Sequence, residues 1–204
     1  MGPLRSGFIY GSVAVLVAVI SDFRFVFLDP ATVDGWIIAV VEQYRTQLAL
    51  AAYLLLAIIA ALKTRPTRLD QGVPYRSLVL RDCTLAATVV AMMVGVALFI
   101  VTFLQATVFA AAISEYARVS SVEIVAYIQE LADRFSSEPP QSSVQDIQRT
   151  LMPPTLADLG RSIFNLVMRG LLLGFAGALV GVLRGRSGST EDQSEPPTYR
   201  EPKN

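Results

Sequence analysis

Arg169 is the residue of this sequence with the clearest potential for chemistry, because it lies inside the apolar stretch Ser162–Leu183. A charge about two turns inside a membrane span costs about 2.5–3.5 kcal/mol on insertion scales, so such a residue usually faces the protein interior and has a partner. Asn165 lies one helical turn earlier, and Asp22 is the best candidate for the partner. These residues predict either an anion or substrate site or a structural role, as an ion pair or a snorkelling arginine. The structural interpretation is favoured.

No other residue pattern indicates catalysis or metal binding. The sequence has no His and a single cysteine, Cys83, which removes the commonest metal ligand and excludes an intrachain disulfide. Nucleotide-binding glycine motifs and the motifs of zinc proteases and serine hydrolases are all missing from the sequence. Basic and acidic residues both number 17, so no net charge favours nucleic acid. We therefore predict that the protein is not an enzyme and has no cofactor, no metal and no nucleic-acid partner.

The composition predicts an integral membrane protein. Hydrophobic residues make up 53% of the 204 residues and charged residues only 17%, against about 25% charged residues in a soluble domain. The apolar runs predict membrane spans at residues 8–28, 44–62, 83–113 and 162–183. The first of them also fits a secretory signal cleaved near Ser21, but the apolar run resumes after that point, and a retained helix is favoured.

Small residues predict how two of these helices pack. The glycines of the fourth span follow helical spacing and share one face, and the third span carries a stripe of small side chains. Such surfaces allow close approach of membrane helices, so we expect the two to meet, although a second copy of the chain is an alternative mate. The residues concerned are Gly170, Gly174, Gly177 and Gly181 of the fourth span and Thr84, Thr88, Ala91 and Gly95 of the third.

Residues 114–161 form the one sizeable polar segment and predict a helical cap. Ser120 to Glu123 has the pattern of a capping box, which predicts the start of a helix that ends near Phe135. Its expected apolar face consists of Ile124, Ile128, Leu131 and Phe135. This helix can lie on the membrane or over the bundle, or it can dock a partner subunit, and both interpretations stay open. A second helix is expected near Ser143–Leu151, and Thr155 with Asp158 predicts the start of the last one.

Basic residues near the spans predict the orientation. Arg5, the five basic residues of 63–81 and Arg184 with Arg186 would share one side, and such residues favour the cytoplasm. We predict a cell-membrane protein with both termini cytoplasmic and residues 114–161 outside. Residues 187–204 are expected to be a disordered tail. In this tail, Pro196-Pro197-Thr198-Tyr199 resembles the PPxY ligand of WW domains, a match short enough to arise by chance.

Together these features predict an all-α integral membrane protein. The expected fold is a four-transmembrane-helix bundle within residues 1–186, with a small extracytoplasmic helical cap between helices 3 and 4. The favoured function is that of a non-catalytic small subunit, scaffold or assembly factor acting through helix packing and its outer helical segment. Its partners would be the lipid bilayer and another membrane protein or a second copy. The alternative is a small homo-oligomeric transporter or channel with Arg169 in a polar site.

Overall fold

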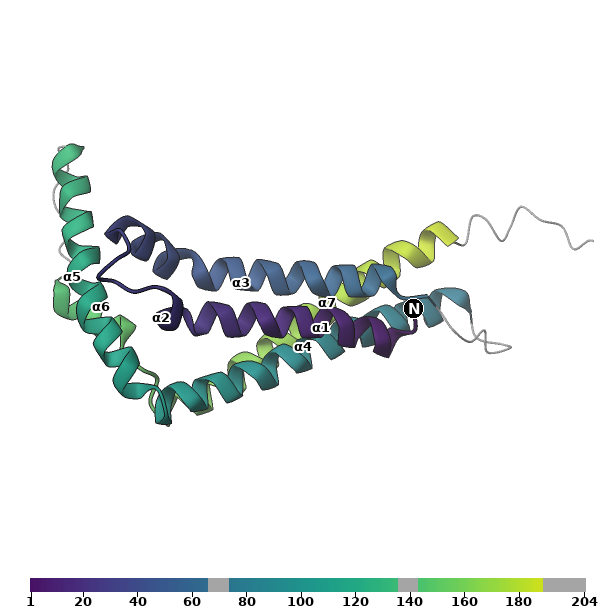
Figure 1. Cartoon of the computed structure of the whole chain (residues 1–204). Helices are drawn as coiled ribbons and strands as arrows, with labels where there is room; N and C mark the ends of the chain where they lie inside the picture. The colour runs from purple at the N-terminus through teal and green to yellow at the C-terminus, as the bar shows by residue number, and fades with distance from the viewer. Residues whose placement is uncertain (66–73, 136–142, 189–204) are drawn as a thin grey trace, which may run out of the picture. The chain divides into compact units, whose positions relative to one another are not determined.

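A computed structural model describes residues 1–65, 74–135 and 143–188, and within these ranges the chain is helical without any strand (Figure 1). Four of the helices are long and apolar enough to cross a membrane. They are α1 (Pro3–Asp22), α3 (Gly35–Lys63), α4 (Tyr75–Thr107) and α7 (Asp158–Gly188). The others are α2 (Arg24–Phe27), α5 (Ala110–Arg134) and α6 (Val144–Leu151). The predicted helical class and the four helices of membrane-spanning length are confirmed.

Two of the expected continuous helices are interrupted. Phe23 separates α1 from α2 within residues 8–28, and Phe109 lies between α4 and α5 within residues 83–113. Both breaks keep backbone hydrogen bonds, because the Phe23 amide donates to the Val19 carbonyl at 2.9 Å and the Phe109 amide donates to the Leu104 carbonyl at 3.0 Å. The two aromatic rings also meet edge to face at 5.2 Å between centroids, so the breaks gain an aromatic contact.

The other long helices extend beyond the apolar stretches that indicated them. α3 begins at Gly35 rather than near Tyr44, and α4 begins at Tyr75, before the expected span of residues 83–113. Apolar residues mark the part of a helix that avoids water, whereas the helical backbone continues through the charged residues at its ends. α7 likewise includes Ser187 and Gly188, which were expected in the tail. The remaining tail, with the Pro196–Tyr199 motif, lies outside the described residues.

The capping box predicted at Ser120 is wrong. Ser120 is buried in the interior of α5, which begins ten residues earlier, at Ala110. A reciprocal capping box exists instead at the start of α6, where Ser143 Oγ accepts from the Asp146 amide and Asp146 Oδ2 accepts from the Ser143 amide, both at 3.2 Å. Short polar side chains cap helices and also occur inside them, so the sequence pattern alone does not separate the two cases.

The described helices cluster into two compact units, and each unit contains part of every long helix. The first unit comprises residues 1–14, 53–93 and the chain from 168, and the second comprises residues 15–52 and 94–167. Ala61, Val79, Cys83 and Val180 form a core cluster in the first unit. Ile38, Ala117, Ile124 and Leu151 form one in the second, where α5 packs against α6.

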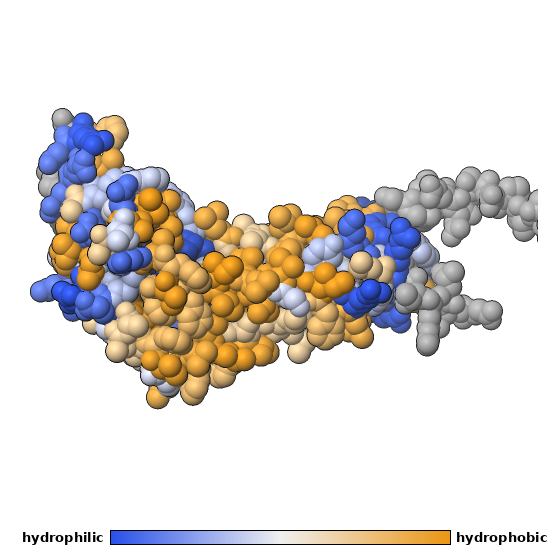
Figure 2. All heavy atoms as spheres, viewed as in Figure 1, coloured by the Kyte–Doolittle hydropathy of each residue, from blue (hydrophilic) through white to orange (hydrophobic). Residues whose placement is uncertain are grey.

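Large apolar side chains remain exposed along all four long helices. Leu16, Leu48, Met92 and Phe175 are each 60% exposed or more. Figure 2 shows apolar side chains over most of the visible middle part of the long helices, with hydrophilic residues toward their ends. Exposed apolar surface costs about 25 cal/mol per Å² in water, so a continuous surface of this kind indicates an apolar environment.

Candidate functional site

Four charged side chains meet in the second unit, and they come from α1, α2 and α3. Glu42 accepts two hydrogen bonds from Arg24, one from Nε to Oε1 and one from Nη2 to Oε2 at 2.8 Å. Arg45 contacts both acids, because its Nη1 lies 3.2 Å from Asp22 Oδ1 and its Nε lies 3.4 Å from Glu42 Oε2. Two acids and two arginines give this charge cluster (Asp22, Arg24, Glu42 and Arg45) no net charge.

Burial differs across the charge cluster. The side chains of Arg24 and Glu42 are 11% and 9% exposed, whereas those of Arg45 and Asp22 are 30% and 24% exposed. A buried charge is tolerated only when it is paired and hydrogen-bonded, and a bidentate arginine–carboxylate pair satisfies both conditions. The Arg24–Glu42 pair is therefore the buried centre of the cluster, and Arg45 with Asp22 forms its more solvated edge.

Tyr116 connects α5 to the charge cluster. Its Oη donates to Glu42 Oε1 at 3.1 Å, and its ring centroid lies 5.8 Å from Arg24 Cζ, within the range of a cation–π contact. Burial, and then the nearby charge of Glu42, raises the pKa of Tyr116 to about 12. The phenol therefore keeps its proton at neutral pH and stays a donor to Glu42, which is contacted by three side chains.

The helix breaks bring further groups to the charge cluster. Because α1 ends at Asp22, the backbone carbonyl of that residue has no partner within its own helix. Gln105 of α4 fills this role, since its Nε2 donates to the Asp22 carbonyl at 2.8 Å. The rings of Phe23 and Phe25 both pack on Phe109, at 5.2 and 5.8 Å between centroids. The arrangement thus ties α1 and α2 to the junction of α4 and α5.

A second set of polar contacts lies in the first unit, at the end of α3. Arg184 Nη1 donates to the carbonyls of Ala61 and Thr64 at 3.0 and 2.8 Å, so a cation of α7 caps the C-terminal end of α3. The buried Cys83 thiol donates to the same Ala61 carbonyl at 3.3 Å. Ser6 of α1 donates to the neighbouring carbonyl of Ala60 at 2.7 Å. These side chains satisfy helix-end carbonyls, which is a structural role.

The residues of the predicted polar site fall in different units. Asp22 belongs to the second unit, where it pairs with Arg45, and Asn165 is an exposed residue of the same unit. Arg169 is half-buried on the part of α7 in the first unit. There it forms no hydrogen bond or ion pair with the described residues of that unit. The predicted pair of Asp22 and Arg169 stays a prediction.

Two of the predicted glycines lie directly against the backbone of α4 in the first unit. A methyl group on Gly177 would lie 2.9 Å from the Cys83 carbonyl oxygen and 3.4 Å from Thr84 Cα, and one on Gly181 would lie 2.8 Å from Leu80 Cα. Helix backbones that approach so closely leave no room for a side chain. At these two positions, therefore, α7 packs on α4 through glycine.

The other residues of the two small-residue surfaces behave differently. A methyl group on Gly174 would lie 3.6 Å from Thr88 Oγ1, an ordinary contact, and one on Gly170 would meet no atom within 4 Å. Ala91 is buried, and Gly95 lies close to Leu166 of α7 rather than to a glycine. Gly185, which was not predicted, packs on Arg76. The close contact is thus shifted toward the C-terminal end of α7.

Sequence reasoning missed Glu42, Arg45 and Tyr116 as members of one site. The available signal was that an acid and an arginine lie two residues apart at 22 and 24 and three residues apart at 42 and 45, both beside apolar stretches. Acid–arginine pairs at the same end of neighbouring helices indicate ion pairs between them. Within the described ranges, no group of three or more acidic or cysteine side chains forms a metal site.

The fold and the charge cluster define a class of protein: an all-helical chain with four helices long and apolar enough to cross a membrane, whose buried charges pair between helices. The chain matches no protein-family model, no curated protein and no solved structure.

Proposed function

We propose that this protein is a non-catalytic multi-pass membrane protein, a small subunit, scaffold or assembly factor that acts by packing its helices against another membrane protein or a second copy. In this proposal α1, α3, α4 and α7 span the bilayer as a bundle, and α5 with α6 forms an extracytoplasmic cap. The basic residues near the spans favour a cell-membrane protein with both termini in the cytoplasm.

The closed charge cluster is the observation that carries this proposal. Glu42 is engaged by Arg24, Arg45 and Tyr116, and Asp22 is engaged by Arg45. A general acid or base must reach a substrate proton, and a transport site must exchange its partner for the substrate. The buried charges here are bonded to each other and to a neutral phenol. Their arrangement therefore supports a structural role.

α7 provides the surface that such a partner would use. Within the most apolar stretch of each long helix, 17% of the residues of α7 are buried, compared with 33% in α4. Phe164, Leu171 and Phe175 are each at least 65% exposed. Arg169 is half-buried and points to a different side of α7. A partner helix packed on the apolar face would cover these three side chains, as a helix interface in the membrane does.

Photo-cross-linking in native membranes tests this proposal. Cys83→Ser provides the background, because serine keeps a donor for the Ala61 carbonyl. A benzophenone is then attached to the new cysteine of Phe175→Cys on α7 or of Leu55→Cys on α3. Both positions are apolar and exposed, at 66% and 58%. We expect illumination to produce a protein adduct, with a second copy or with another protein, at position 175 and little at position 55. Lipid adducts alone at both positions would contradict the proposal.

The transporter or channel alternative predicts a different result, and the half-buried Arg169 is the residue that favours it. The purified chain in liposomes would then show solute or ion flux, and Arg169→Leu would abolish the flux without changing assembly. We expect no flux from the wild-type chain. A flux that disappears in Arg169→Leu while the protein remains folded and assembled would establish the alternative instead.

A further inference from the structure

The apolar face of α5 continues beyond the part that the protein covers. Ile124 is 6% exposed and packs with Ile38 of α3 and Leu151 of α6 in the core of the second unit. Farther along the same face, Leu131 and Phe135 are 40% and 72% exposed. Residues four apart follow one another along a helix face. The final two turns of α5 therefore present apolar side chains that α3 and α6 leave largely exposed.

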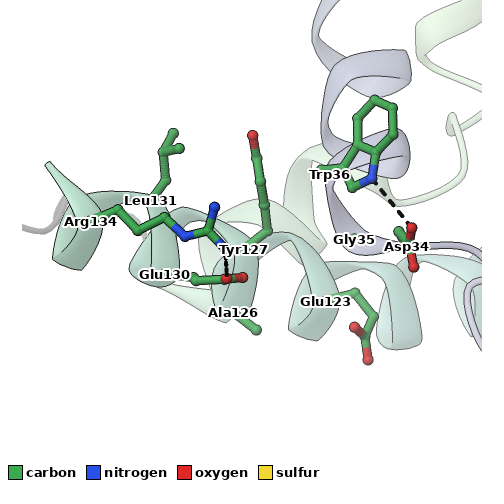
Figure 3. A pocket seen from close by; sticks show the side chains of 9 residues that line it. All are labelled: Asp34, Gly35, Trp36, Glu123, Ala126, Tyr127, Glu130, Leu131 and Arg134. Atoms are coloured by element: carbon green, nitrogen blue, oxygen red, sulfur yellow. Dashed lines mark hydrogen bonds and ion pairs between the residues drawn. The ribbon is translucent and has the colours of Figure 1, made fainter.

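The first turn of α3 crosses α5 beside this exposed face. A methyl group on Gly35 would lie 2.8 Å from the Glu123 carbonyl oxygen and 3.5 Å from Tyr127 Cβ, so the two helices touch here. A groove of about 490 Å³ opens at the crossing, and its lining includes Trp36 of α3 with Tyr127 and Leu131 of α5. Figure 3 shows these three side chains on one side of α5, the side on which α3 continues from Gly35.

We infer that α5 from Tyr127 to its end at Arg134, together with Phe135, lies in the interfacial layer of the membrane, with Trp36, Tyr127 and Leu131 in contact with phospholipid. The inference rests on the proposed membrane location. α3 continues from Trp36 as a helix of membrane-spanning length, so the side of α5 on which α3 continues is the side of the bilayer. Tryptophan and tyrosine prefer the headgroup level, where an apolar ring and a polar atom are both accommodated.

The charges around the groove agree with this orientation. Glu123 points to the opposite side of α5 from Tyr127 (Figure 3), which is the aqueous side in this arrangement. Arg134 Nη2 pairs with Glu130 at 2.6 Å, and Asp34 accepts from Trp36 Nε1 at 3.3 Å. The groove has more acids than arginines, so attraction to anionic lipid is not the driving force. Burial of the apolar side chains is the driving force, and a zwitterionic phospholipid is the expected occupant of the groove.

Tryptophan quenching measures this contact, because Trp36 is the only tryptophan of the chain. The full chain is reconstituted in phosphatidylcholine vesicles with lipids brominated near the headgroup end of the acyl chain, or with iodide on both sides. In a Trp36→Phe background, Leu131→Trp reports on the exposed face of α5, and Ala126→Trp reports on an exposed position of the opposite side. We expect brominated lipid to quench most emission from wild-type Trp36 and Leu131→Trp, and iodide to quench mainly Ala126→Trp.

A third variant separates this inference from the membrane location on which it rests. Leu55→Trp in the same background reports on the middle of the expected span 44–62 within α3, where the side chain is 58% exposed. If lipids brominated deep in the chain leave it unquenched, the membrane location itself is wrong. If they quench it while iodide reaches Leu131→Trp as readily as Ala126→Trp, only the interfacial position of α5 is overturned. Protection of Leu131→Trp from both quenchers also overturns it, because protein would then cover that face.

Discussion

Replacing Glu42 by glutamine tests whether the charge cluster holds the second unit together. The substitution removes one of two negative charges, so the cluster changes from neutral to a net charge of +1. Arg24, 11% exposed, loses the carboxylate to which it donates two hydrogen bonds. Arg45 is 30% exposed and keeps Asp22 at 3.2 Å. The loss of stability therefore comes mainly from Arg24, because its buried guanidinium has little contact with water that could compensate for the lost carboxylate charge.

The expected magnitude follows from this difference in burial. Removing one partner of a buried ion pair costs about 3–5 kcal/mol, whereas a solvated pair contributes about 0.2–1 kcal/mol. We expect Glu42→Gln to lower the free energy of unfolding by about 3 kcal/mol. This value is at the lower end of the range for a buried pair, because the glutamine amide still accepts and donates hydrogen bonds. Arg45→Gln, at the solvated edge, is the matched control and is expected to cost about 1 kcal/mol or less.

A double-mutant cycle isolates the pair from the rest of the cluster. Combining Glu42→Gln with Arg24→Gln restores neutrality and leaves Arg45 with Asp22. We expect the double variant to be more stable than the sum of the single changes implies, with a coupling of about 2 kcal/mol. Unfolding in mixed micelles of increasing dodecyl sulfate content, followed by circular dichroism, measures each variant. Additive single effects, or equal costs for Glu42→Gln and Arg45→Gln, would refute the reasoning.

Three further predictions concern helix packing and pH. Gly177→Ala should lower the free energy of unfolding by about 1–3 kcal/mol, because its methyl group would lie 2.9 Å from the Cys83 carbonyl oxygen. Gly170→Ala, with no atom within 4 Å, should instead raise it by about 0.5–1 kcal/mol through helix propensity. Equal stabilities of the two variants in the same micelles would contradict this prediction. Burial raises the pKa of Tyr116 from 10.0 to about 12. The stability contributed by the protonated phenol is therefore complete below pH 10 and is lost as the pH rises to about 12. Tyr116→Phe should show neither this alkaline loss of stability nor the tyrosinate absorbance step near pH 12. The Ser143 hydroxyl and amide lower the pKa of Asp146 below its ordinary 3.8, so α6 should lose stability as the pH falls through the lowered pKa; a helix signal with the same acid dependence in Asp146→Asn would show that the cap does not titrate.

The sequence was sufficient for the number of long apolar helices but not for where they end. Composition reports which residues avoid water, and that property is averaged over a whole span. A helix end depends on single hydrogen bonds and contacts instead. Phe23 lies between Asp22 and Arg24, and Phe109 lies inside an apolar run, and neither has Pro or Gly beside it. The contact between their rings, which accompanies the two breaks, is seen only in the structure. The buried Ser120 was misread for the same reason, because its capping pattern depends on surroundings that are not local.

The candidate site shows the same limit. Arg169 attracted attention because a charge within an apolar run is costly, whereas Arg24 and Glu42 lie near the ends of apolar runs, where charges are ordinary. Their pairing depends on α2 and α3 meeting across 18 residues of sequence, and the Tyr116 contact spans 74. Sequence patterns identify partners within one helix through their spacing. Partners on separate helices have no such spacing, so the sequence indicates charges near these helix ends but not which of them pair.

The breaks and the charge cluster depend on each other. At the first break α1 ends at Asp22, and the carbonyl of that residue accepts from Gln105 of α4. The break also begins α2 at Arg24, which is the position that pairs with Glu42. On the other side, the break at Phe109 begins the helix that carries Tyr116 to the same carboxylate. Aromatic contacts at the two breaks and ion pairs beyond them therefore stabilise one arrangement, and losing either set removes the geometry on which the other relies.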